Sequence, residues 1–337
     1  MVLTIAHRRI PLLSVACSAA FAAAFSPSMR ADPALLGSPI ASRNLSPVYA
    51  NLGVPVMQDA RGLHAGSWEL GWQFHWASHS VRESGADGNL EFDGETQRHD
   101  LKLAVGLGAG FDVNLTLPWI RHDGGALDSL IDDWHAFWGL PDGPRPRQGQ
   151  DQLRYFSNSG AGFLLDDNAS GFGDAELDLA WRFAELDGAQ ISAFAHAKFA
   201  TGEARDFTGS GSDGASVGLR ASAGECVSVR VSCHMQVGVA YIGEVDLVPS
   251  ADDTLWFGGV SVSWLLTDRI AITGQIDAHA SPFDGPLNEG GDPIWGALGV
   301  RYSPGDSWRF DFQFSEDLAV GSAPDVTFLV SASRRFR

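Results

Sequence analysis

From Trp68 onward, the chain alternates apolar and polar side chains over the length of a β-strand, turns, and begins again. In the first such segment, apolar residues occupy every second position, at Trp68, Leu70, Trp72, Phe74 and Trp76. Because successive strand residues point to opposite faces, one face of this segment is aromatic and the other polar. The pattern recurs throughout the chain while the polar face carries charges, which is typical of a transmembrane β-barrel with lipid outside and a polar interior.

The alternation predicts twelve strands, an even number, as a bacterial single-chain barrel requires. The first begins at Trp68, and the others span residues 96–107, 111–120, 172–183, 190–200, 214–223, 234–243, 255–265, 269–280, 293–302, 307–315 and 326–336. Short links alternate with long ones, as periplasmic turns alternate with extracellular loops, so both termini should be periplasmic. We therefore expect an all-β fold, a 12-stranded antiparallel transmembrane β-barrel over residues 67–337 in the cell outer membrane, with one short helix in a long extracellular loop.

The residues before the barrel divide into two parts. Arg8 and Arg9 precede an apolar, alanine-rich stretch, so residues 1–31 are expected to be a secretory signal peptide, cleaved after Ala24 or after Ala31. Residues 32–66 then form either a periplasmic N-terminal segment or a plug. No later stretch offers about 18 uninterrupted apolar residues, so no transmembrane helix is expected.

The acidic balance restricts the partners. Loss of residues 1–31, which carry three arginines and no acid, would change the formal net charge from −18 to −21. Such a charge argues against nucleic acid, which needs basic surfaces. An acidic mouth concentrates positive charge, so among small solutes cations or zwitterions should be favoured. Outer-membrane lipid and the barrel-insertion machinery, which reads an aromatic near the C-terminus such as Phe336, are the other expected partners.

The cysteines predict a disulfide. Cys17 would be lost with the signal peptide, which leaves Cys226 and Cys233 as a pair in an oxidising compartment. Their spacing fits a link across a periplasmic turn. A cysteine-based metal site would need more ligands nearby, and no phosphate-binding or dinucleotide fingerprint is present, so neither a metal site nor a cofactor is expected.

The polar faces of the predicted strands carry charges of both signs together with histidines. The expected lumen-lining residues are Glu69, His75, Arg98, Asp100, Lys102, Asp112, Glu176, Asp178, Arg182, His196, Lys198, Arg220, Asp277, His279, Arg301, Arg309 and Asp311. Opposed charged walls tune the selectivity of channels. The alternative is that ion pairs close the interior, since a barrel of this size is narrow enough for side chains to fill it.

The long connection after the third strand, residues 121–171, contains a predicted helix. Apolar residues recur at helical spacing over residues 127–138, and Gly139 and Pro141 end the helix. In a barrel such a helix can enter the mouth and constrict it, in which case Asp128, Asp132, Asp133, Trp134 and His135 would line the constriction. Equally, the helix can pack over the loops.

The same region resembles a known family. Residues 124–141 read Gly-Gly-Ala-Leu-Asp-Ser-Leu-Ile-Asp-Asp-Trp-His-Ala-Phe-Trp-Gly-Leu-Pro. Further blocks lie at residues 42–47, 92–98 and 200–203, the last with Ala200 where the family has proline. Together these blocks resemble an uncharacterised family of Gram-negative proteins, a domain of unknown function. The resemblance covers most of the chain and implies an outer-membrane location, but it brings no known activity.

Three functions are consistent with these observations. The first is a passive channel or facilitator for small solutes. The alternative is a closed barrel with a structural or ligand-binding role at its loops. The weakest alternative is an outer-membrane hydrolase. The twelve-stranded phospholipases need a lipid-facing histidine followed by Ser-Asn-Gly. Here Ser157 and Asn158 lie in a loop with no preceding histidine. We therefore expect the protein not to be an enzyme.

Overall fold

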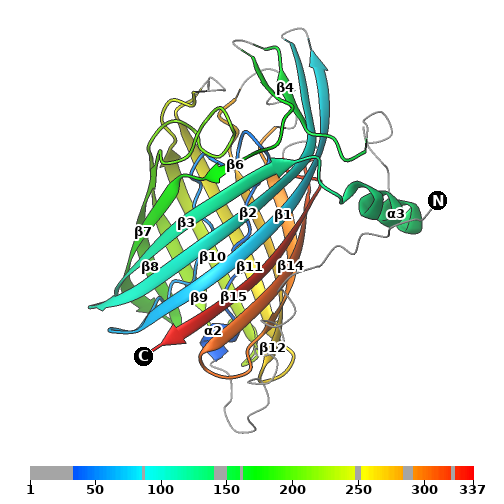
Figure 1. Ribbon diagram of the computed structural model, residues 1–337. Coiled ribbons are helices and arrows are strands. Elements are labelled where there is room, and N and C mark those ends of the chain that lie inside the picture. Colours follow the sequence, from blue (N-terminus) through cyan, green and yellow to red (C-terminus); the bar gives the residue numbers. More distant parts are fainter. Residues whose placement is uncertain are drawn as a thin grey trace, which may run out of the picture.

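The computed structural model describes residues 33–85, 88–139, 150–159, 162–246, 252–283, 291–319 and 323–337. Over these residues, twelve long antiparallel strands form a closed barrel (Figure 1), which confirms the predicted fold class. The barrel strands are β1 (Trp68–Gly85), β2 (Gly88–Gly108), β3 (Phe111–Asp123), β7 (Ala175–Leu186), β8 (Ala189–Phe199), β9 (Gly214–Ala223), β10 (Val231–Tyr241), β11 (Thr254–Leu265), β12 (Ile270–His279), β13 (Ile294–Tyr302), β14 (Trp308–Asp317) and β15 (Val326–Phe336). Pairing of Trp68 with Phe336 closes the sheet between β1 and β15.

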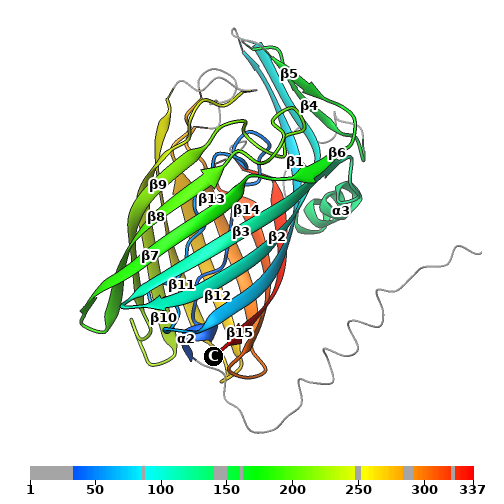
Figure 2. The same ribbon diagram turned by 60° about the vertical axis from the view of Figure 1, so that its left-hand side comes forward.

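Two departures from the predicted strands occur at the end of the barrel that carries the long loops. Strands β1 and β2 continue past the wall to Gly85 and Gly88, where the short strands β4 (Arg154–Ser157) and β5 (Phe163–Leu165) extend the sheet (Figure 2). The strand predicted at residues 172–183 instead begins at Ala175 and ends at Leu186, and Phe172 belongs to a separate short strand. Strand β6 (Ala169–Phe172) pairs with the upper part of β3 and β7 with the lower part.

The outer face of the barrel is apolar. Outward-pointing side chains such as Trp72, Leu101, Val237, Trp264 and Leu298 are exposed, whereas the alternating inward side chains are mostly polar and buried. A closed ladder leaves no unpaired strand edge, and an apolar belt matches hydrocarbon, so this wall is built to lie in a bilayer. Among the described helices, none has the length and hydropathy that crossing a membrane would require.

The barrel interior contains the chain that precedes β1. Residues 33–66 begin with the short helix α2 (Pro33–Leu36) and then run through the lumen, as the blue segment in Figure 2 shows. Leu35, Leu36, Leu45 and Leu52 of this segment are at most 1% exposed. We call residues 33–66 the N-terminal segment below.

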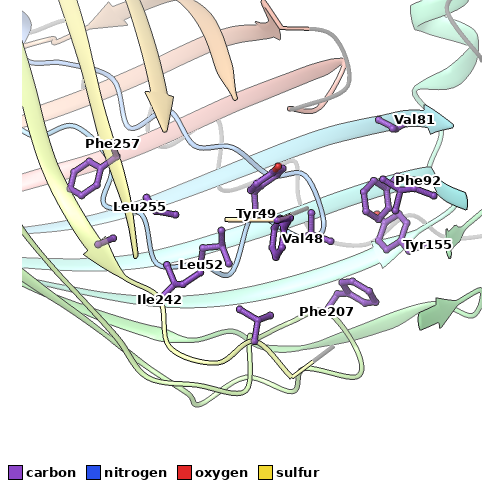
Figure 3. Packing of buried hydrophobic residues seen from close by; sticks show 14 of the residues in the cluster. Val48, Tyr49, Leu52, Val81, Phe92, Tyr155, Phe207, Ile242, Leu255 and Phe257 are labelled. Carbon is purple, nitrogen blue, oxygen red and sulfur yellow. The ribbon is translucent and has the colours of Figure 1, made fainter. Parts of the chain in front are cut away.

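An apolar cluster lies at the loop end of the interior. Tyr49 and Leu52 of the N-terminal segment pack there with Ile242, Leu255 and Phe257 (Figure 3). The same cluster continues through Phe92, Tyr155 and Phe207 into the sheet extension. The N-terminal segment thus shares a core with the loops above the barrel.

The predicted disulfide is confirmed. Cys226, in the connection between β9 and β10, is bonded to Cys233 on β10, with their Cα atoms 5.8 Å apart. This connection lies at the end of the barrel where the short turns lie, so the bond closes the longest of these turns.

The predicted helix forms as α3 (Asp128–Trp138), but it lies outside the barrel (Figure 1). Leu127 and Ile131 pack against Val326, with Trp76, Phe314 and Phe328 around them. These partners belong to the outward faces of β1, β14 and β15, because they alternate with the buried inward residues of those strands. The apolar face of α3 therefore covers lipid-facing side chains.

Candidate functional site

The strands place all the residues expected to line the lumen on their inward faces. Thirteen of these residues are buried, and only Glu69, Lys102, Arg182 and Arg309 keep partial exposure. The buried ones are His75, Arg98, Asp100, Asp112, Glu176, Asp178, His196, Lys198, Arg220, Asp277, His279, Arg301 and Asp311. Strand alternation alone accounts for this placement. It does not account for the burial, which depends on the N-terminal segment.

A group of charged residues joins the N-terminal segment to β2 and β7. Arg98 donates hydrogen bonds to Asp100 Oδ1 at 2.7 Å and to Glu176 Oε1 at 2.9 Å. Arg43 of the N-terminal segment donates to the other oxygen of Glu176 at 2.6 Å. Two arginines therefore share one buried carboxylate. The sequence analysis missed Arg43, although it lies in one of the blocks that carry the family resemblance.

Arg301 on β13 holds the backbone of the N-terminal segment. Its Nε donates to Asp311 Oδ1 at 2.5 Å. Its other nitrogens donate to the carbonyl oxygens of Leu35, Leu36, Ser38 and Pro39, at 3.3 Å for both leucines and 3.1 Å for Pro39. Arg301 thus satisfies the carbonyls at the end of α2, which have no partner within so short a helix.

Further hydrogen bonds between the N-terminal segment and the wall follow its whole length. They join Ile40 N and O to the Gln275 amide, each at 3.0 Å, Ser42 Oγ to Trp295 Nε1 at 2.8 Å, Asn44 to His279 at 3.3 Å, Pro55 O to Gln236 Nε2 at 3.1 Å, and Ala60 N to Ser222 Oγ at 2.9 Å. The contact with the wall is therefore mainly polar. Apolar contacts lie near both ends, in the cluster at the loop end and where Leu36 packs with Leu265 and Ala271 near the short turns.

Other charged residues pair within the wall and without the N-terminal segment. Arg220 on β9 donates to both oxygens of Asp178 on β7, at 3.0 and 2.7 Å, and its guanidinium stacks 3.9 Å from the Phe194 ring. Lys198 on β8 lies 3.2 Å from Asp174, which precedes β7. The Arg220–Asp178 pair reaches across β8, and the Lys198–Asp174 pair joins β8 to the start of β7, so both pairs stiffen the barrel.

One ion pair lies within the N-terminal segment itself. Arg61 Nε donates to both oxygens of Asp59, at 2.8 and 2.9 Å. Burial alone would raise the pKa of Asp59, but the hydrogen bonds and the charge of Arg61 outweigh it and lower that pKa. Arg182 on β7 donates to the Arg61 carbonyl, so this part of the segment also contacts the wall.

The predicted lumen histidines His75, His196 and His279 form no hydrogen bond with a carboxylate in the part of the chain that the structure describes. His75 Nε2 lies 3.8 Å from Asp100, and His196 Nδ1 lies 3.9 Å from Asp178, both beyond hydrogen-bond distance. His279 contacts Asn44, and its ring packs at a tilt against the Tyr49 ring. Over the described ranges, no three histidine, cysteine or acidic side chains gather closely enough to hold a metal ion.

The structure does not place the residues expected at a constriction in the mouth. Helix α3 covers the outer wall, because its apolar face fits the lipid-facing side chains of β1, β14 and β15. Asp128 accepts a hydrogen bond from Asp151 N, Asp132 accepts one from Gln150, and Asp133 is exposed. The side chains of Trp134 and His135 lie outside the described part. Neither alternative describes this position fully, because the helix lies outside the lumen but packs on the outer wall rather than over the loops.

Two of the family-like blocks meet at the start of α3. Glu95 accepts hydrogen bonds from the backbone N–H groups of Ala126 and Leu127 and from Trp76 Nε1. Gly125 has φ of +74°, and a Cβ there would collide with the Glu95 carboxyl. The carboxylate thus caps the helix, and only glycine allows it to approach.

Comparison with known proteins agrees with the fold. A family model described as "Protein of unknown function (DUF3187)" matches residues 13–336. The COG4313 outer-membrane channel from Pseudomonas putida F1 superposes with a TM-score of 0.55 at 11% identity, covering 82% of this chain and 98% of that one. A Pseudomonas aeruginosa FadL homologue gives 0.41 at 10% identity, covering 91% and 98%. No curated protein matches the sequence. At 11% identity, the similarity to the COG4313 channel shows the fold alone, that of an outer-membrane β-barrel.

Proposed function

The chain belongs to this family of proteins of unknown function, and we propose from its geometry that it is a passive outer-membrane channel for small solutes. The N-terminal segment acts as a plug that closes the lumen. The observation that carries the proposal is the polar contact between the segment and the wall, in which Arg43 and Arg301 reach across to carboxylate and carbonyl oxygens. Water can replace such partners when the segment leaves, whereas it cannot replace an apolar core.

The wall is suited to an open state because most of its charges are paired without the plug. Arg98 with Asp100, Arg220 with Asp178, and Arg301 with Asp311 all join wall residues. Removal of the N-terminal segment would therefore leave a polar lumen in which few charges lose their partner. A polar, water-filled interior is the usual interior of a channel-forming barrel.

The charge preference of the proposed channel comes from its loops. Among the wall residues predicted to line the lumen, cations and carboxylates are equal in number. The cations are Arg98, Lys102, Arg182, Lys198, Arg220, Arg301 and Arg309, and the carboxylates are Glu69, Asp100, Asp112, Glu176, Asp178, Asp277 and Asp311. The net charge of −18 therefore lies elsewhere, and at a low-dielectric mouth it would enrich cations and zwitterions.

A second candidate is a closed barrel whose loops do the binding. One observation favours it, the apolar cluster in which Tyr49 and Leu52 pack against Phe257 and Ile242. Leu52 is 1% and Ile242 0% exposed, so displacing this part of the N-terminal segment would expose well-packed side chains.

Solute flux separates the two candidates. The full chain and a variant lacking residues 33–60 are reconstituted in liposomes, and swelling is followed with small sugars, amino acids and salts. We expect slow swelling for the full chain and fast swelling for the variant. Both samples must show the heat-modifiable gel mobility of a folded barrel. Two folded proteins that are equally impermeable would support the closed barrel.

A further inference from the structure

A cavity of about 140 Å³ separates the N-terminal segment from β1, β2, β3 and β13–β15 in the half of the barrel near the short turns. It exists because the wall carries small side chains at this level, with Gly71, Ala104, Ser331 and Ser333 lining it. A water molecule takes up about 30 Å³ in the liquid, so the cavity has room for a small solute.

One corner of the cavity is positively charged. Arg309 donates to Glu69 at 2.9 Å, and Arg335 donates to the same carboxylate at 3.3 Å. Lys102, which also lines this corner, forms no ion pair with any residue that the structure describes. Arg301 adds a fourth cation, but it is already paired with Asp311. These four cations face Glu69, Asp311 and Asp59, and Asp59 is also bonded to Arg61. Lys102 is therefore the cation of this corner that has no ion pair among the described residues.

A single carboxylate lines the cavity on β3. Asp112 is 8% exposed and accepts a hydrogen bond from Asn114 at 3.2 Å. It forms no ion pair within the described ranges. Gly62 of the N-terminal segment packs against it so closely that a Cβ at Gly62 would collide with Asp112 Oδ2. The carboxylate is therefore held in place beside the plug while its charge lacks a direct cationic partner.

The two charges lie at a distance that a short solute can span. Lys102 is opposite Thr116 in the β2–β3 ladder, four residues along β3 from Asp112. Four residues correspond to about 13 Å along a strand. The side chain of Lys102 spans part of this distance. The remaining distance matches the length of a molecule whose carboxylate and ammonium groups are several bonds apart.

We propose that this cavity is a binding site for small zwitterions of the size of a dipeptide. Lys102, with Arg309 and Arg335 beside it, binds the solute carboxylate, and Asp112 binds its ammonium group. Charge-assisted hydrogen bonds are the strong ones, and they are stronger where water is largely excluded. The proposal rests on the proposed function only in requiring that solutes reach the lumen.

Calorimetric titration of the folded protein in detergent tests the site with three probes. These are glycylglycine, N-acetyl-glycylglycine, which lacks the ammonium, and glycylglycinamide, which lacks the carboxylate. We expect glycylglycine to bind about tenfold or more tightly than either blocked form, because each lost ionic hydrogen bond costs at least that factor.

Two variants then assign the ends. Lys102→Met should remove the preference for glycylglycine over glycylglycinamide and keep the preference over the acetylated form. Asp112→Asn should remove the preference for glycylglycine over the acetylated form and keep the preference over glycylglycinamide. Asp187→Asn, in the turn between β7 and β8, is the matched control and should bind like the wild type. If Lys102→Met does not fold, Lys102→Gln replaces it.

Equal binding of the three probes would overturn the proposal. So would equal affinity for glycylglycine and its acetylated form, which would indicate a simple anion site. The assay needs no transport, so its outcome is separate from that of the channel. Selective binding without flux would contradict the proposed channel and support the site, whereas flux without selective binding would do the opposite.

Discussion

Arg43 offers a direct test of how the N-terminal segment is held. Arg43→Met removes the guanidinium that donates to Glu176 at 2.6 Å and keeps a side chain of similar length. The partner carboxylate remains buried and keeps Arg98, 2.9 Å away. The substitution therefore weakens the contact between plug and wall without leaving Glu176 wholly unpaired.

The expected size of the effect follows from the burial of the pair. The side chains of Arg43 and Glu176 are 6% and 7% exposed. Removal of one partner from a buried ion pair costs about 3–5 kcal/mol, and we take the lower end, about 3 kcal/mol, because Arg98 remains. At 1.4 kcal/mol for each factor of ten, the population with a displaced segment should rise about 100-fold.

Single-channel recording in planar bilayers measures this change. Open events should be about 100-fold more frequent or longer in Arg43→Met than in the wild type. Arg61→Met is the control. It removes the same group from the same segment, but the hydrogen bonds of that group run to Asp59 two residues away. An unchanged open probability in Arg43→Met would refute this account of how the segment is held.

Three further outcomes are expected. Glu95→Ala should loosen the start of α3 by about 1 kcal/mol, seen as faster proteolysis of the loop, and should leave conductance unchanged because α3 lies outside the lumen. A Cys226→Ser/Cys233→Ser variant should still form the barrel but unfold at lower temperature, by about 2–3 kcal/mol, and an unchanged midpoint would contradict this. Arg220→Met should destabilise the barrel to urea by about 3–5 kcal/mol, since it leaves Asp178 buried without its arginine, whereas Arg205→Gln on the surface should change little.

The barrel could be predicted because its pattern is local. A period of two in side-chain polarity decides which residues face lipid, and parity places residues such as Asp100 and Arg301 inside. The same pattern does not predict the sheet extension. From Ser78 to Ser80 every residue of β1 is buried, so the alternation in burial is lost there, and the ring of Tyr155 on β4 packs against His79.

The position of the N-terminal segment could not be predicted in this way. The segment has no regular period, and its contacts join residues far apart in sequence, for example Arg43 with Glu176 and Asn44 with His279, 133 and 235 residues away. The helix α3 shows a related limit. Its apolar face was clear from the spacing of residues such as Leu127 and Ile131. The surface that the helix covers could not be predicted, because an apolar helix face can pack equally well in the mouth of the lumen and on the lipid-facing wall.

The central claim, that the N-terminal segment closes an otherwise open barrel, is tested most directly by single-channel conductance. The full chain is compared with a variant lacking residues 33–60, each checked for folding by heat-modifiable mobility. We expect a stable, large conductance for the shortened protein and mostly closed traces for the full chain. A folded, shortened barrel that shows no conductance would contradict it.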